Sequence, residues 1–442
     1  MESADPARRR AMMSDRERLR FLAASNVRYK PLEAILRRLA PVPADPLVGL
    51  ILDPHEFRYR RALCARALLG RVPPEHAAAL AECGRDATVD FEVRNPVLMS
   101  VLSMPGTREA DDLLSWLRTC EIDAEERASD SLSPAISLAR AMDGDASAVE
   151  ALAERATDPW WTERTEAEQA IEALIRARGH AAVLSAFGRD STEALARHGR
   201  SPAERLLGLR CHRRAGGDIT FCLGDDSALV ARKAYDLLIE SRGADEELLV
   251  TVRENRPGHV WALAVLHKRG HDIRPLWEEA GSPRIELPGV PSDVREAIVR
   301  HYAPGQRDTD PRWLVEAALL GPSLPSEDRD DLIEKRLDFA FRALRAWGLK
   351  PQKPLSAHQD YGQGSSTYHV ISTDAGKVYL STLGPFFMLR DEHEEVKALL
   401  QMSGFRHIGK ELGATVFTGL AVYYFGIRDP LRIRNLLFYW QD

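Results

Sequence analysis

A recurring pair of aspartate and glycine residues constrains the fold of this chain more than any other feature. Six aspartates precede segments with helical periodicity, at intervals of 37, 33, 35, 32 and 35 residues: Asp53, Asp90, Asp123, Asp158, Asp190 and Asp225. The helical segments end near Gly70, Gly106, Gly144, Gly179, Gly216 and Gly243. Aspartate before a helix accepts hydrogen bonds from free backbone N–H groups, and glycine after it adopts the left-handed conformation at little cost. The spacing predicts one capped helical hairpin per 32 to 37 residues.

Hydrophobic periodicity in the same region also indicates helices. Apolar residues recur at steps of three and four in Phe57–Leu69, Ala77–Cys83, Val93–Met104, Ala110–Cys120, Ile136–Met142 and Val149–Ala156. This period places the apolar side chains on one face of each helix. A single hairpin cannot bury such a face alone, so the hairpins are expected to stack.

Two segments carry a resemblance to a known family. They are Asp90-Phe-Glu-Val93-Arg94-Asn-Pro96 and Asp225-Asp-Ser-Ala-Leu-Val230-Ala-Arg232-Lys-Ala234. Their order of Asp, Val and Arg resembles the start of the second helix in HEAT-like repeats, and Asp53 with Arg58 and Arg60 is a looser match. The resemblance spans about residues 41–270 and implies a mainly α protein, an α-solenoid whose Asp and Arg residues form a structural ladder between repeats. An irregular helical domain is the alternative.

The composition changes along the chain and predicts four regions. Residues 1–40 form a basic helical leader, 41–270 the HEAT-like repeats, 271–350 a proline-rich helical extension, and 351–442 a small α+β module. Helices are expected at Ser292–His301 and Trp313–Leu320, with a bridging helix at Glu327–Trp347. The module has the predicted order ββ-helix-ββ: Tyr368–Thr373, Lys377–Thr382, Asp391–Ser403, Thr415–Phe425 and Leu431–Trp440.

Charge and cysteine content limit the classes of function. The chain has 442 residues and a net charge of −6, with +5 in residues 1–40, −13 in 41–330 and +2 in 331–442. The acidic middle region repels a nucleic-acid backbone, although the basic leader remains a possible contact with nucleic acid or an acidic partner. Five cysteines without C-x-x-C spacing are typical of reduced thiols in a cytoplasm. The sequence predicts neither a transmembrane helix nor a signal peptide.

Candidate binding residues occur at two places. Trp160 and Trp161 are either a partner anchor or a pair with one ring in the core. His358, Tyr361 and His369 belong to a polar, glycine-containing stretch that is either a ligand-binding loop or a plain linker. The acidic run Asp391-Glu-His393-Glu-Glu395 resembles a metal site, but acidic residues in a first helical turn also complement the helix dipole. We therefore predict no metal site, cofactor site or catalytic residue.

Taken together, these features favour a cytoplasmic, bacterial, non-enzymatic adaptor or scaffold. A protein partner would bind the concave surface of the helical repeats, with no membrane involved. One alternative is a HEAT-like DNA-repair enzyme that excises modified bases, which requires a basic concave face. A further alternative is an immunity-type protein that neutralises a toxin through its C-terminal module.

Overall fold

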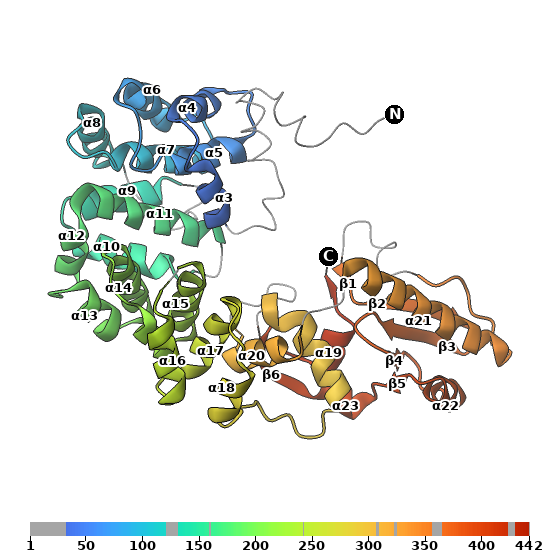
Figure 1. Ribbon diagram of the computed structural model, residues 1–442. Coiled ribbons are helices and arrows are strands. Elements are labelled where there is room, and N and C mark those ends of the chain that lie inside the picture. The colour runs from blue at the N-terminus through green and yellow to red at the C-terminus, as the bar shows by residue number, and fades with distance from the viewer. Residues whose placement is uncertain are drawn as a thin grey trace, which may run out of the picture. The chain divides into compact units, whose positions relative to one another are not determined.

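The protein divides into two compact units, Met1–Gly217 (unit 1) and Asp218–Asp442 (unit 2), which we describe separately. The structure is a computed structural model that describes residues 32–120, 131–158, 161–241, 243–305, 309–321, 325–355, 365–422 and 429–441. The described part is mainly helical and contains a small sheet region near the C-terminal end (Figure 1). This agrees with the predicted class, a mainly α protein with strands confined to its last region.

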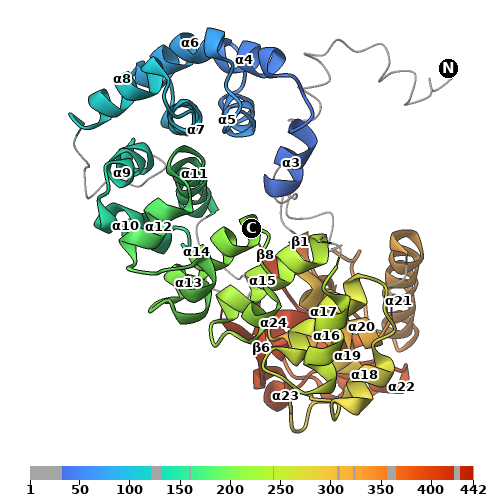
Figure 2. The ribbon, with the colours of Figure 1, turned by 60° about the vertical axis from the view of Figure 1, so that its left-hand side comes forward.

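The described part of unit 1 is helical. Its helices are α3 (Leu32–Leu39), α4 (Ala44–Leu52), α5 (Arg58–Ala67), α6 (Pro74–Arg85), α7 (Phe91–Leu102), α8 (Arg108–Leu117), α9 (Ser133–Met142), α10 (Ala146–Arg155), α11 (Trp161–Arg178), α12 (His180–Ala186), α13 (Thr192–His198) and α14 (Pro202–Arg214). Helix α6 packs against α4 and α8, while α5 packs against α7. Figure 2 shows the two rows that result, with α4, α6 and α8 in one and α5 and α7 in the other. Their apolar faces share one core that extends from Ile35 to Cys211.

The predicted glycines end their helices as expected, whereas the aspartates act in several ways. All six glycines of the rhythm have positive φ, between 73° and 102°. Asp90 is the N-cap of α7 and accepts a hydrogen bond from the Glu92 N–H at 2.9 Å. Asp53 and Asp225 accept from N–H groups two residues later, in the turns that precede α5 and α15. Asp123 lies outside the described residues.

Unit 2 begins with helices that continue to residue 346. They are η3 (Thr220–Gly224), α15 (Ala228–Glu240), α16 (Asp245–Arg253), α17 (His259–Lys268), α18 (Arg274–Glu279), α19 (Ser292–Tyr302), η4 (Ala303–Gly305), α20 (Pro311–Leu319) and α21 (Ser326–Ala346). The predicted helices at Ser292, Trp313 and Glu327 are confirmed as α19, α20 and α21 to within two residues at each end.

The C-terminal part of unit 2 differs from the predicted order. Its segments are β1 (Ser365–Ser366), β2 (Tyr368–Thr373), β3 (Gly376–Ser381), β4 (Phe386–Leu389), α22 (Glu394–Met402), β5 (Arg406–His407), α23 (Lys410–Ala414), β6 (Val416–Ala421), β7 (Pro430–Arg432), α24 (Ile433–Leu437) and β8 (Trp440–Gln441). The main sheet has the order β2-β3-β4-β5, in which β4 and β5 are parallel. The first hairpin and the helix are therefore confirmed, but β4 was missed.

The predicted strand Leu431–Trp440 is confirmed only at its ends, which lie in β7 and β8, and β7 pairs with β6. The centre of the predicted strand forms α24, which buries Ile433, Leu436 and Leu437 in a core shared with α19, α20 and β6. These three residues have the spacing of a helix face, and the apolar run offered both readings. The Trp313 ring lies 4.8 Å from that of Phe417, so this core joins described residues on both sides of position 350.

Candidate functional site

The structure describes the side chain of only one of the five residues predicted to bind a partner. Trp160, His358 and Tyr361 lie outside the described residues, and only the backbone of Trp161 is described, as the first residue of α11. His369 lies in β2 opposite Leu380 and is 1% exposed, in the interior of the sheet region. The candidate site is therefore built from other side chains.

Two buried arginines hold equivalent places in successive hairpins of unit 1. Arg61 and Arg94 are each the fourth residue of their helix, in α5 and α7. Each donates from Nε to the carbonyl oxygen ten residues earlier, Arg61 to Ile51 at 2.8 Å and Arg94 to Gly84 at 2.9 Å. They thus satisfy carbonyl groups at the ends of α4 and α6, which have no partner within their own helices. Arg61, rather than Arg58 or Arg60, is the counterpart of Arg94.

Further hydrogen bonds connect neighbouring hairpins at separations of 31 to 35 residues. The Ser100 hydroxyl donates to the Ala65 carbonyl at 2.7 Å, and the Ser103 hydroxyl accepts from the Gly70 N–H at 2.7 Å. Arg71 donates to the carbonyls at the end of α3, including that of Ala40 at 2.7 Å. We call these bonds, together with the ion pair between Arg58 and Asp90, the interlayer contacts. Their separation along the chain is close to one interval of the aspartate and glycine rhythm.

Helix α11 carries acidic side chains toward two other helices. Glu166 forms a buried ion pair with Arg66 of α5, whose Nε also donates to Gln169 at 3.0 Å. Glu168 pairs with Arg210 of α14. Burial raises the pKa of Glu166, while Arg66 opposes that shift. Among the described residues, Oε2 of Glu166 has no hydrogen-bond partner, so this carboxylate is held mainly by the arginine.

These contacts determine the charge of the surface formed by α5, α7, α11 and α14. Arg58 pairs with Asp90 at 2.9 Å and with Glu92 at 3.3 Å. Glu172 of α11 pairs with Arg176 and with Arg214. A surface that binds a phosphate backbone gains affinity from cations that are available to replace counterions. Arg58, Arg176 and Arg214 already have carboxylate partners, so at these positions the surface presents both signs of charge side by side.

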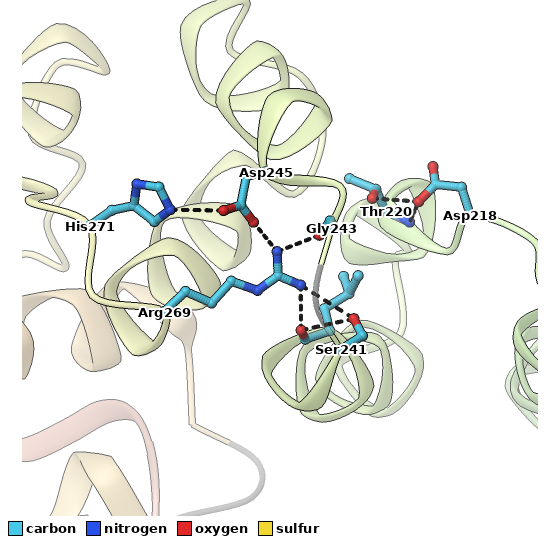
Figure 3. Close-up of polar contacts among 8 residues, drawn as sticks. Asp218, Thr220, Ser241, Gly243, Asp245, Arg269 and His271 are labelled. Carbon is cyan, nitrogen blue, oxygen red and sulfur yellow. Dashed lines mark hydrogen bonds and ion pairs between the residues drawn. The ribbon is translucent and has the colours of Figure 1, made fainter.

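Unit 2 contains a polar cluster centred on Arg269, just after α17 (Figure 3). Its guanidinium donates to the Gly243 carbonyl at 2.6 Å and the Leu238 carbonyl at 2.5 Å, and pairs with Asp245. Asp245 also lies 3.0 Å from Nε2 of His271. Hydrogen bonds from His271 and Arg269 hold the pKa of Asp245 below its usual value. The cluster fastens the turn between α15 and α16 to the end of α17.

The acidic run at the start of α22 forms no metal cluster in the described part of the chain. In the described part of the chain, the three potential metal-binding groups that lie within 4.8 Å of one another belong to Asp45, Glu75 and His76. The two carboxylates are exposed and lie in the first turns of α4 and α6, where acidic groups complement the helix dipoles. Their position has a structural explanation without a metal.

The cysteines are free thiols. Burial raises the pKa of Cys64 and of Cys211 to about 12, and both side chains are inaccessible to solvent. Nucleophilic chemistry requires the thiolate, which a high pKa and an apolar environment suppress. Both residues therefore serve as core side chains.

Comparison of the chain with family models, curated proteins and solved structures finds no match. In the part of the chain that the structure describes, no helix combines the length and the apolar run needed to cross a bilayer.

Proposed function

We propose that the protein is a non-enzymatic adaptor that binds another protein through a HEAT-like stack of helical hairpins in unit 1. The interlayer contacts carry this proposal, because they recur at a separation of one predicted repeat. A stack of this kind exposes an extended surface made of several successive layers, and such surfaces serve for binding.

The chemistry of the surface favours a protein partner over a nucleic acid. Several arginines of α5, α11 and α14 are paired with carboxylates, as Arg58 is with Asp90 and Arg214 is with Glu172. At the start of α5, Phe57 is 62% exposed and is followed by Arg58, whose side chain is 57% exposed. An exposed aromatic ring beside an arginine is a common centre of protein–protein binding energy. We place the partner contact at this end of α5.

A quantitative capture experiment tests the proposal. The full chain and its Phe57→Ser/Arg58→Glu variant are used as baits in the native lysate, and the recovered proteins are compared by mass spectrometry. We expect at least one protein to be enriched by the full chain and reduced about tenfold or more by the variant. Arg108→Glu, which changes an arginine that is 88% exposed on α8, should retain that protein.

Two outcomes would count against the proposal. The first is that the full chain and the Phe57→Ser/Arg58→Glu variant, both folded, recover the same proteins. The second is a shift of duplex DNA by the full chain at low salt that disappears as salt increases, which would favour the nucleic-acid alternative.

A further inference from the structure

A cavity in unit 2 lies among α18, the segment that follows it, α19 and α20. Its volume is about 290 Å³, close to the lower end of the range for small-molecule sites. Ser282, in the wall, has φ of 50°, a backbone conformation that residues other than glycine rarely adopt. Such strained residues are frequent at ligand sites. The side chains that line the cavity indicate which kind of ligand it fits.

In one wall of the cavity, an arginine and a glutamate neutralise each other. Arg295 makes two bonds of 2.6 Å to the carboxylate of Glu316 and donates to the Ile285 carbonyl at 2.9 Å. Its guanidinium also lies 4.6 Å from the centre of the Trp313 ring. Because these contacts hold the guanidinium in place and satisfy its charge, the pair of Arg295 and Glu316 forms a fixed part of the wall.

Four further charged side chains line the cavity, and all are exposed: Arg274, Arg284, Glu278 and Glu296. Arg274 donates to the Leu319 carbonyl at 3.2 Å. Within the described residues, none of the four forms an ion pair. The cavity thus offers two unpaired cations and two unpaired anions to whatever enters it.

The rest of the lining is apolar or lacks a partner. Leu319 and Leu320 contribute aliphatic surface, and Trp277 contributes an indole ring that is 3% exposed. The Trp277 N–H is buried and has no acceptor among the described residues. A buried donor without an acceptor is costly, and such groups in a folded protein call for an explanation. Because this N–H is inaccessible to solvent, the Trp277 ring contributes apolar surface to the cavity and no donor.

We infer that this cavity binds a small zwitterion with an apolar side chain, that is, a free α-amino acid such as L-phenylalanine. A purely anionic ligand would be repelled by Glu278 and Glu296, and a purely cationic one by Arg274 and Arg284. An α-amino acid meets both pairs, with its carboxylate toward the arginines and its ammonium group toward the glutamates. Its side chain then contacts Trp277 and the two leucines.

Titration calorimetry of the full chain tests this inference. L-phenylalanine is compared with 3-phenylpropanoate, which lacks the ammonium group, and with 2-phenylethylamine, which lacks the carboxylate. We expect saturable binding of L-phenylalanine with Kd of about 1 mM or below, and at least tenfold weaker binding of each analogue. Arg284→Gln should weaken L-phenylalanine binding about tenfold, whereas Arg253→Gln, at an exposed position of α16, should leave it unchanged.

The inference is overturned if folded protein shows no saturable binding of L-phenylalanine or L-leucine up to about 10 mM. It is also overturned if 3-phenylpropanoate binds as tightly as L-phenylalanine, because the site would then recognise only the anion. Unchanged affinity in a folded Arg284→Gln variant has the same consequence. The cavity lies in unit 2 and the proposed protein contact in unit 1, so each hypothesis can fail separately.

Discussion

Contacts of different range organise the two units. In unit 1, most hydrogen bonds between neighbouring hairpins connect residues about one interval apart, such as Ser100 and Ala65, which are 35 residues apart, and Arg66 forms a longer-range bond to Gln169, 103 residues away. In unit 2, the Tyr302 hydroxyl donates to the Leu436 carbonyl, 134 residues away, and the Trp313 N–H donates to the Thr418 carbonyl, 105 residues away. Most contacts between hairpins of unit 1 therefore repeat at short range along the chain, whereas the core around Trp313 forms only when distant segments meet. Substitutions should therefore affect the two units differently.

The largest effect is expected at Trp313, which is fully buried between α20 and β6. Trp313→Ala leaves a cavity and a carbonyl group without its donor, so the free energy of unfolding of unit 2 should fall by about 3–5 kcal/mol. Urea unfolding monitored by circular dichroism measures this change. Trp347→Ala, at a ring that is 64% exposed, serves as the control and should change it by less than about 0.5 kcal/mol.

In unit 1, two glycine-to-alanine substitutions should change the free energy of unfolding in opposite directions, and one of them tests the close packing of α13 on α14. A Cβ on Gly208 would lie 2.3 Å from the backbone nitrogen of Ala196, so Gly208→Ala should destabilise the unit by about 2–3 kcal/mol. Gly49 of α4 has open space at that position, so Gly49→Ala should stabilise by about 0.5–1 kcal/mol. Thermal unfolding of both variants measures the difference. Effects of the same sign would contradict the close packing of α13 on α14.

The buried arginine of α7 tests the contacts between helices of one hairpin. Arg94→Met keeps an unbranched side chain but removes the donor to Gly84, which should lower the free energy of unfolding by about 1–2 kcal/mol. Arg108→Met on α8 changes an exposed arginine and should have an effect below about 0.5 kcal/mol. Equal stability of the two variants would show that the arginine at this position of the hairpin has no structural role.

The sequence predicted the local features of the fold better than the contacts between distant segments. Helix existence in unit 1 and the glycine ends were correct because periodicity and left-handed glycines are local properties. The structural roles of Arg61 and Arg66 were missed, because both residues lie among many other arginines. Only Arg61 could have been found from the sequence, because it precedes Arg94 by 33 residues, about one repeat. The strand predicted at Leu431–Trp440 failed at its centre because the apolar run there fits a strand or a short helix, and the contacts with α19 and α20 select the helix. Most predicted binding residues fall outside the described part.

A smaller, pH-dependent effect is expected at the Arg269 cluster of unit 2. The lowered pKa of Asp245 means that the folded state favours its ionised form. This contribution to stability is present at neutral pH and is lost as the pH falls through the folded-state pKa. Asp245→Asn should therefore lower the melting temperature at pH 7, and its difference from the unchanged chain should shrink toward pH 3. Glu286→Gln, at an exposed position, is the control, and a pH-independent difference for Asp245→Asn would contradict the account.

The smallest effect concerns thiol reactivity in unit 1. Cys64 and Cys211, with pKa of about 12 and buried side chains, should remain unmodified by iodoacetamide in the native protein at pH 8. The half-buried Cys83 and Cys120 should react first. Peptide mass spectrometry identifies the modified residues, and early modification of Cys64 would contradict its burial in the core.

Hydrogen exchange at single-residue resolution tests the repeated short-range organisation of unit 1 most directly. In low concentrations of urea, the account predicts that amides of α4 and α5, of α6 and α7, and of α10 and α11 open as separate groups with different free energies. In unit 2, by contrast, amides of α20, β6 and α24 should open together. A single opening free energy throughout unit 1 would contradict the stack of hairpins.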